Sequence, residues 1–269
     1  MFIRRALAAC TAAVAVGFAV APPAHATSAT LYAELAELAD ELNSLAWPGQ
    51  DTYNHYPGEL GHPDGASTAV WGTPGSPTTY ESKAKCAPLL TLALRHTFSW
   101  ATDSYLTTEF GSTSPTSAQY YDGLQAGADH FTAKTTVPSL VAGDVIAVKY
   151  LDSTGGTGDA TGHTMIVAGA PQLYNRDGNA STREYAVPVI DSTSNPHGVP
   201  STWSGSPVHL FPDTRRSGTT EYTGVGRGWI FISTGSDDVP TGHWWGANEN
   251  VTTQYKPTST RPMAFATLP

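Results

Sequence analysis

The hydrophobic pattern of the chain changes from a helical to a strand-like period near residue 140. Before that point, residues 29–47 place leucines at alternating spacings of four and three, which is the stripe of an amphipathic helix. Residues 86–100 form a leucine-rich run with Pro88 in its first turn, which predicts a buried helix. A shorter helix is predicted over 117–127.

Beyond residue 140, apolar runs are bounded by glycine, proline or polar residues. They cover 144–150, 163–168, 185–191 and 228–233, and each predicts a strand. Helices followed by strands that are joined by turns predict an α+β domain with a mostly antiparallel sheet. The glycine-rich stretch 224–228 predicts a tight turn before the last strand.

Two segments show no clear period. Residues 50–80 are rich in proline, glycine, threonine and aromatic residues, and predict an ordered loop with little regular structure. The tail after Val239 is predicted to be irregular. We expect the amphipathic helix, within 27–49, to dock on the core of the following domain, while dimerisation and a role as a pro-segment stay open.

The first 26 residues have the composition of a secretory signal peptide. Arg4 and Arg5 precede an apolar run of small residues over 6–21, and an A-x-A cleavage motif ends at Ala26. We therefore expect a secreted, extracellular protein that begins at Thr27 after processing. No other apolar run approaches the roughly 20 residues of a membrane span, so none is predicted.

The charge of the chain limits its partners. The formal net charge is −9, from 14 Lys and Arg against 23 Asp and Glu. Without a basic stripe the chain is not expected to bind a phosphate backbone, which argues against a nucleic-acid partner. The same charge argues against electrostatic binding to anionic lipid.

Signal removal would leave Cys86 as the one cysteine of a secreted protein. An unpaired thiol is unusual in an oxidising compartment. Such a residue is either a buried cysteine that packs as a small hydrophobe or a nucleophile. The count of cysteines alone leaves both interpretations open.

Three residues together favour the nucleophile. Cys86 lies at a predicted helix start, where unpaired N–H groups stabilise a thiolate. His163 opens a predicted strand and could take the thiol proton, and Asp191 closes the next strand and could orient the imidazole. Adjacent strands would bring these two side chains together, facing the helix start.

The order of these residues, together with the sequences around two of the strands, resembles the papain-like cysteine hydrolases. Residues 142–148 read AGDVIAV and residues 162–167 read GHTMIV, which is similar to the NlpC-type and CHAP-type cell-wall peptidases and amidases. The similarity is closest to a secreted bacterial family of uncharacterised papain-like hydrolases. It spans roughly residues 79–245.

This resemblance implies a papain-like (NlpC-type) hydrolase domain over 50–269, with a nucleophile helix packed on a mostly antiparallel sheet. It implies a Cys86–His163–Asp191 triad that cleaves an amide bond in a peptide or in peptidoglycan through a thioacyl-enzyme, with no cofactor and no metal. The sequence departs from the NlpC type in three ways. The nucleophile is followed by Ala-Pro-Leu instead of Ser-Gly or similar small residues, and the third residue is Asp where it is often His, Asn or Gln. The loop between the two catalytic strands is also long.

Two other functions stay open. One is a non-enzymatic secreted binding module on a degenerate papain-like scaffold. The other is acyl transfer, because transglutaminase-like proteins share the Cys–His–Asp order and residues 189–193 are similar to their final strand.

The oxyanion donors are predicted from position. The backbone N–H of Cys86 at the helix start is one donor. Papain-like enzymes add a polar side chain a few residues upstream, which makes Tyr80 the first candidate and Ser82 the second.

Other polar and aromatic residues have structural alternatives. His55, His62 and Asp64 suggest a zinc site but match no metallopeptidase motif, so no metal is predicted. We expect a structural ion pair between Asp213 and an arginine, with Arg215 and Arg227 as candidates, in a region that also holds His197. The tryptophans that could line a cleft or complete a core are Trp71, Trp203, Trp244 and Trp245.

Overall fold

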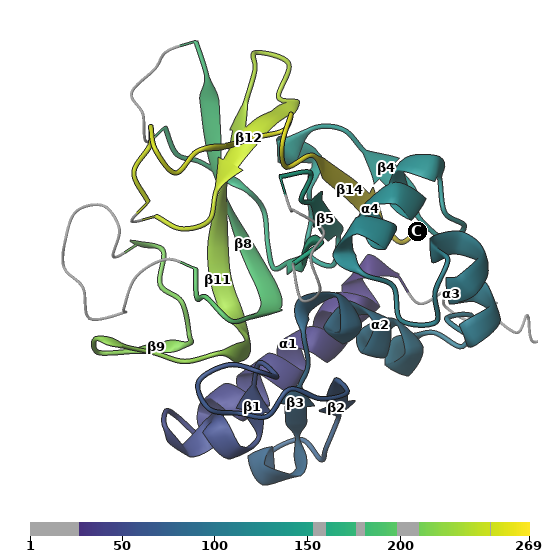
Figure 1. The fold of residues 1–269 in the computed structure, drawn as a ribbon, viewed down its shortest axis with the longest axis vertical. Coiled ribbons are helices and arrows are strands. Elements are labelled where there is room, and N and C mark those ends of the chain that lie inside the picture. Colours follow the sequence, from purple (N-terminus) through teal and green to yellow (C-terminus); the bar gives the residue numbers. More distant parts are fainter. Residues whose placement is uncertain (1–26, 153–159, 176–180, 198–209, 248) are drawn as a thin grey trace, which may run out of the picture.

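The computed structural model of the protein describes residues 27–152, 160–175, 181–197, 210–247 and 249–269. The predicted signal peptide lies outside these residues, as does Trp203. Within them, the protein is a mixed α+β structure in which helices cover one face of an antiparallel sheet (Figure 1).

Four α-helices precede the main strands in this part of the chain. They are α1 (Ser28–Ser44), α2 (Cys86–Thr97), α3 (Asp103–Phe110) and α4 (Ser117–Ala126). Three of them confirm the predicted helices, and α3 was not predicted. None of the helices in the described residues has both the length and the apolar character that crossing a bilayer requires.

The main sheet has nine strands, and all its pairings are antiparallel. In spatial order they are β13 (Lys256–Pro257), β12 (Pro240–Trp244), β11 (Gly224–Thr234), β8 (Arg183–Thr193), β6 (Gly162–Val167), β5 (Val145–Lys149), β14 (Met263–Thr267) and β4 (Thr132–Lys134), with β7 (Gln172–Leu173) on β8. The four predicted strands are confirmed. The expectation of an irregular tail is wrong, because β12, β13 and β14 all belong to this sheet.

The segment predicted as a loop over 50–80 also has regular structure. A small sheet holds β1 (Asn54–His55), β3 (Glu81–Lys83) and β2 (Thr68–Val70), in that order, with β1 parallel to β3.

A hairpin of β9 (Arg216–Ser217) and β10 (Thr220–Glu221) precedes β11. The 3₁₀ helices are η1 (Gly49–Thr52), η2 (Pro77–Thr79) and η3 (Val137–Ser139).

The core consists of apolar residues that recur with a helical period in the helices and alternate between the two faces of the sheet in the strands. The leucine stripe of α1 is buried with the apolar residues of α2, α3 and α4. Strand β5 contributes Val145 and Ala147 to this cluster, whereas Ile146 and Val148 pack in a second cluster on the other face of the sheet. Burial on both faces explains the continuous apolar runs of the central strands.

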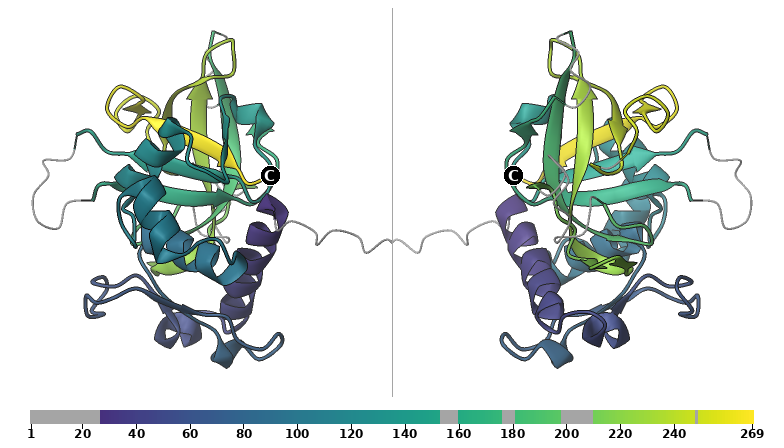
Figure 2. Two further views of the ribbon diagram at one scale, coloured as in Figure 1. Left: turned by 90° about the vertical axis from the view of Figure 1, so that its right-hand side faces the viewer. Right: turned by 90° about the vertical axis from the view of Figure 1, so that its left-hand side faces the viewer.

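The helix α1 docks on the domain, as the sequence predicted. Its leucines at 31, 35, 38 and 42 are at most 1% exposed. At its first residue, the Ser28 N–H donates to the Leu268 carbonyl over 3.1 Å, beside the C-terminus (Figure 2). Near the C-terminal end of the helix, Asp40 accepts two hydrogen bonds from Arg227 of β11. The helix is therefore tied to the sheet at both places.

Candidate active site

Cys86 is the first residue of α2 and follows closely on β3. The N–H groups of a first helical turn have no partner within the helix, so the Cys86 N–H has no acceptor inside α2. The hydroxyl of Ser117, at the start of α4, lies 3.6 Å from the Cys86 sulfur. Ser192 of β8 donates to the carbonyl of Ala84, which ties the approach to α2 to the main sheet. The thiol thus lies where α2, α4 and the sheet meet.

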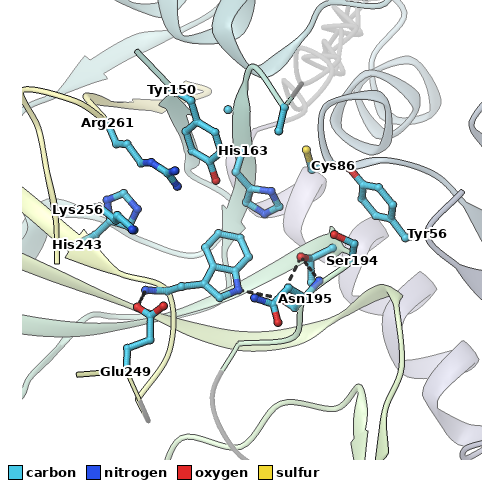
Figure 3. A pocket seen from close by; sticks show the side chains of 14 residues that line it. Tyr56, Cys86, Tyr150, His163, Ser194, Asn195, His243, Glu249, Lys256 and Arg261 are labelled. Atoms are coloured by element: carbon cyan, nitrogen blue, oxygen red, sulfur yellow. Dashed lines mark hydrogen bonds between the residues drawn. The ribbon is translucent and has the colours of Figure 1, made fainter. Parts of the chain in front are cut away.

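His163 connects Cys86 to Asp191. The strands β6 and β8 are antiparallel neighbours, which brings these two buried residues together. Nε2 of His163 donates to Oδ2 of Asp191 over 2.6 Å. This bond leaves Nδ1 for the thiol, and the ring lies beside the Cys86 sulfur (Figure 3). The structure therefore brings together the three residues that the sequence singled out.

Cys86 and His163 stabilise opposite charges on each other. Burial opposes ionisation of the Cys86 thiol, but the charge and hydrogen bond of His163 and the Ser117 hydroxyl outweigh burial and lower its pKa to about 7. Burial likewise opposes the imidazolium, but Cys86 and Asp191 raise the pKa of His163 to about 9. Between these values the pair is a thiolate and an imidazolium, which is the activated form of a cysteine nucleophile.

Asp191 is the centre of a buried polar cluster. Its Oδ2 also accepts from Nε2 of His197 over 2.9 Å, and its Oδ1 accepts from the Arg215 guanidinium over 2.8 Å. Arg215 also donates to Asp213, through Nε over 2.9 Å and Nη2 over 2.7 Å. Burial opposes ionisation of Asp191, but Arg215 and His197 hold its pKa well below the usual range. His163 is therefore oriented by a carboxylate that stays ionised.

Two glycines of β11 make room for this cluster. A Cβ at Gly226 would lie 2.9 Å from Nε of Arg215, and one at Gly228 would lie 2.6 Å from Oδ2 of Asp213. The tight turn predicted over 224–228 is therefore wrong, since these glycines lie inside a strand on which the cluster packs directly. The predicted ion pair between Asp213 and an arginine is confirmed, with Arg215 as the partner.

Trp245 packs over both histidines of the cluster. Its ring stacks on His197 with 3.9 Å between centroids, and it meets His163 at 78° with 4.7 Å between centroids. Its carbonyl accepts from Nδ1 of His197 over 2.8 Å. The indole thus limits the access of water to the hydrogen bond between His163 and Asp191.

The other described tryptophans that could have lined a cleft are structural. Trp244 is 3% exposed and packs in a third apolar cluster with Phe231. Trp71 stacks on His96 and donates to the Glu34 carbonyl of α1. Of the three candidates within the described residues, Trp245 is the one that the structure brings to the site.

Tyr80 and Ser82, the predicted oxyanion donors, do not face the thiol. Tyr80 is fully buried, and its hydroxyl donates to Glu37 of α1 over 2.6 Å. Ser82 is fully buried within β3. Proximity in sequence gave the wrong candidates, because η2 and β3 turn these side chains toward the core.

Tyr56 has the position that was expected of Tyr80. Strand β1 pairs in parallel with β3, so that His55 lies opposite Lys83, and the residue after each strand continues toward the start of α2. The Tyr56 hydroxyl points at the Cys86 sulfur (Figure 3). Burial, and then the charge of Cys86, raise the pKa of Tyr56, so its hydroxyl keeps the proton that an oxyanion donor needs. No local signal in the sequence marks this residue.

Two lobes of a cavity meet at the thiol. The first, which we call the basic lobe, has a volume of about 320 Å³ and extends past His163; it is lined by residues that include Tyr150, His243, Trp245, Lys256 and Arg261. The second, the outer lobe, has a volume of about 520 Å³ and runs along the segment after Tyr56 and the starts of α2 and α4. Both lobes are lined by Tyr56 and Cys86, so the thiol is open to each.

The histidines that suggested a zinc site do not converge on an ion. The rings of His55 and His62 stack with 3.7 Å between centroids. Asp64 instead forms an ion pair with Lys85 over 2.9 Å. Both rings also contact Asp51, His55 through the Asp51 carbonyl and His62 through its carboxylate, so these histidines serve local packing rather than a ligand set.

One group in the described residues has metal-binding side chains close together. It consists of His163, Asp191 and His197. Both histidines already donate to the carboxylate, and the guanidinium of Arg215 lies against its other oxygen. These hydrogen bonds satisfy the carboxylate directly, so we assign no metal to the site.

Comparison with known proteins gives one relative and no function. No family model matches the chain, and no solved structure matches it. An uncharacterised protein of Acanthamoeba polyphaga mimivirus is 27% identical over 184 residues, which cover 65% of this chain and 74% of the viral protein. The functional argument therefore rests on the geometry of the site.

Proposed function

We propose that this protein is a secreted cysteine hydrolase of the papain-like, NlpC or CHAP type, which cleaves an amide bond through a thioacyl-enzyme. The observation that carries the proposal is the thiol at the head of a helix, beside a histidine that is hydrogen-bonded to a buried carboxylate. A nucleophile helix packed on an antiparallel sheet also supports the papain-like assignment.

The first half of the reaction forms the acyl-enzyme. The Cys86 thiolate adds to the carbonyl carbon, and the oxygen takes the electron pair as an oxyanion. The Cys86 N–H and the Tyr56 hydroxyl donate to that oxygen. When the carbonyl re-forms, the C–N bond breaks, and the amine leaves with the proton of His163 Nδ1.

The second half releases the acid. A water molecule gives a proton to Nδ1 of His163 as its oxygen adds to the thioester carbon. The tetrahedral intermediate then collapses, the C–S bond breaks, and Cys86 returns to the thiolate. Asp191 keeps the imidazole oriented through Nε2 in both halves.

The substrate class that we propose is a cell-wall peptide. The resemblance to NlpC-type and CHAP-type enzymes supports it, and so does the signal-peptide composition of residues 1–26. A cleft that is open on both sides of the thiol suits an extended peptide chain.

The pH dependence of thiol labelling tests whether Cys86 is activated. Alkylation by iodoacetamide follows the thiolate, and the pKa of about 7 predicts half-maximal labelling near that pH. An ordinary thiol reaches half-maximal labelling at about pH 8.5. Mass spectrometry of the tryptic peptide 86–95 separates Cys86 from Cys10.

The His163→Ala variant is the matched comparison for that experiment. Without the imidazolium, the largest influence that lowers the pKa of Cys86 is lost, so the midpoint of labelling should move to higher pH. A Cys86 that labels only after denaturation, or a midpoint that is the same in both proteins, would show that the thiol is structural.

A pair of tyrosine variants tests the oxyanion donor. Tyr56→Phe should lower kcat by a factor on the order of 10²–10³ with little change in KM, because the hydroxyl acts when the oxyanion forms. Tyr80→Phe loses only the hydrogen bond to Glu37 and should keep the wild-type kcat. Steady-state kinetics on a peptide amide measures both, and equal kcat values in the two variants would contradict the assignment of Tyr56.

A further inference from the structure

The two lobes of the cavity would bind different parts of a substrate, one the acyl side and the other the leaving-amine side of the cleaved bond. His163 lines the basic lobe but is not among the residues of the outer lobe. In the proposed reaction His163 gives its proton to the leaving amine. The leaving side of the substrate therefore enters the basic lobe, and the acyl side enters the outer lobe.

Cationic side chains are concentrated in the basic lobe. Arg261, Lys256 and His243 lie close together at one end of it, and His163 stands between them and Cys86 in this view (Figure 3). The Arg261 guanidinium lies 3.9 Å from the centroid of the Tyr150 ring. The lobe thus offers a fixed guanidinium and an ammonium close to the reacting thiol.

Neither cation is fully used by the described part of the protein. Asp152 engages Arg261 through Nε, at 3.1 and 3.2 Å, so the terminal nitrogens of Arg261 form no ion pair within the described residues. Lys256 forms no ion pair within the described residues. The other nearby carboxylate, that of Glu249, accepts from the Trp245 N–H.

His243 is a buried histidine whose Nδ1 has no hydrogen-bond partner among the described residues. The residue is 2% exposed and lies opposite Lys256 in the pairing of β12 with β13. Burial, and then the charges of Arg261 and Lys256, lower its pKa to about 3. An unpaired polar group at this depth is unfavourable, and the residue also lines the lobe that holds the two cations.

We propose that the basic lobe binds a carboxylate on the leaving side of the substrate, through Lys256 and the terminal nitrogens of Arg261, beside the buried ring of His243. A carboxylate accepts several hydrogen bonds at once, and charge-assisted bonds to Lys and Arg are the strongest of them. This inference rests on the proposed function, and it names the leaving group as an amino acid, or a short peptide, with a free carboxylate. The enzyme would then act near the carboxyl end of its substrate.

A binding experiment tests the subsite without turnover. Glycine and glycinamide mimic the leaving amine and differ only in the carboxylate. In the Cys86→Ala protein, glycine should shift the ¹⁵N signals of the His243 ring, and glycinamide should not. Lys256→Met should weaken the glycine Kd about tenfold, Lys256→Arg should restore it, and Lys83→Met, on β3, should leave it unchanged.

A kinetic experiment tests the same subsite in the active enzyme. Two peptides that end in a free acid or in a carboxamide should differ in kcat/KM in favour of the acid, and Lys256→Met should remove that preference. If glycine binds selectively but no amide is cleaved, the subsite stands and the hydrolase proposal fails. If both peptides are cleaved equally and glycine leaves His243 unshifted, the subsite is wrong and the hydrolase proposal stands.

Discussion

Replacing Cys86 by alanine is expected to abolish turnover and to leave the fold intact. The thiol is the atom that bonds to the substrate, and removal of the nucleophile from a triad costs a factor on the order of 10⁴–10⁶ in kcat. Cys86 is 9% exposed and belongs to the apolar cluster of the helices, so loss of its sulfur should lower the free energy of unfolding by about 1–2 kcal/mol. Digestion of purified peptidoglycan and of peptide amides measures turnover, and urea unfolding measures stability.

Companion variants separate a triad from a structural cysteine. His163→Ala should be nearly as damaging, and the double variant with Cys86→Ala should be no worse than either single change, because the two residues act as one unit. Asp191→Asn should cost less turnover, since an amide still holds the ring. Equal turnover in the wild type and Cys86→Ala would overturn the mechanism.

Two of the helices that the sequence predicted, α1 and α2, have many apolar positions at a helical period. The missed helix α3 buries only Leu106 and Phe110, which gives a stripe too short to recognise. Its N-cap, Thr102, accepts a hydrogen bond from the Tyr105 N–H and is the local signal that could have identified it.

The missed strand β14 has no comparable signal. Its alternation is weak, because Phe265 lies between two alanines. The strand pairs with β5, far away in sequence, where Phe265 lies opposite Ile146. Tertiary pairing, rather than local propensity, makes this segment a strand.

The residues of the candidate site also fall into those that the sequence could identify and those that depend on tertiary pairing. Cys86, His163 and Asp191 could be identified because each begins or ends an element with a strong pattern. Tyr56 could not, because its place beside the thiol depends on the parallel pairing of β1 with β3 across a long excursion of the chain. The central position of Arg215 could not be predicted either, since it depends on two glycines of the neighbouring strand.

The cluster around Asp191 leads to the largest expected effect on stability. Arg215 is fully buried and contacts two buried carboxylates, those of Asp191 and Asp213. Arg215→Met should lower the free energy of unfolding by about 3–5 kcal/mol, because it leaves buried charges without a partner. Arg227→Met is the matched control. Its guanidinium also pairs with an aspartate, Asp40, but at the surface, where such pairs contribute about 0–1 kcal/mol.

The difference in the free energy of unfolding between wild type and Arg215→Met should depend on pH in a definite direction. In the wild type the pKa of Asp191 is depressed, so its stabilising contribution is present above the unfolded value of about 3.9 and is lost as the pH falls through the folded value. Without Arg215 the folded pKa of Asp191 should rise, and burial of the carboxylate should cost more as the pH increases. The amount by which Arg215→Met is less stable than wild type should therefore increase between about pH 4 and pH 7. Urea unfolding at several pH values measures it, and a deficit that matches the small one of Arg227→Met at every pH would show that the buried cluster does not depend on this guanidinium.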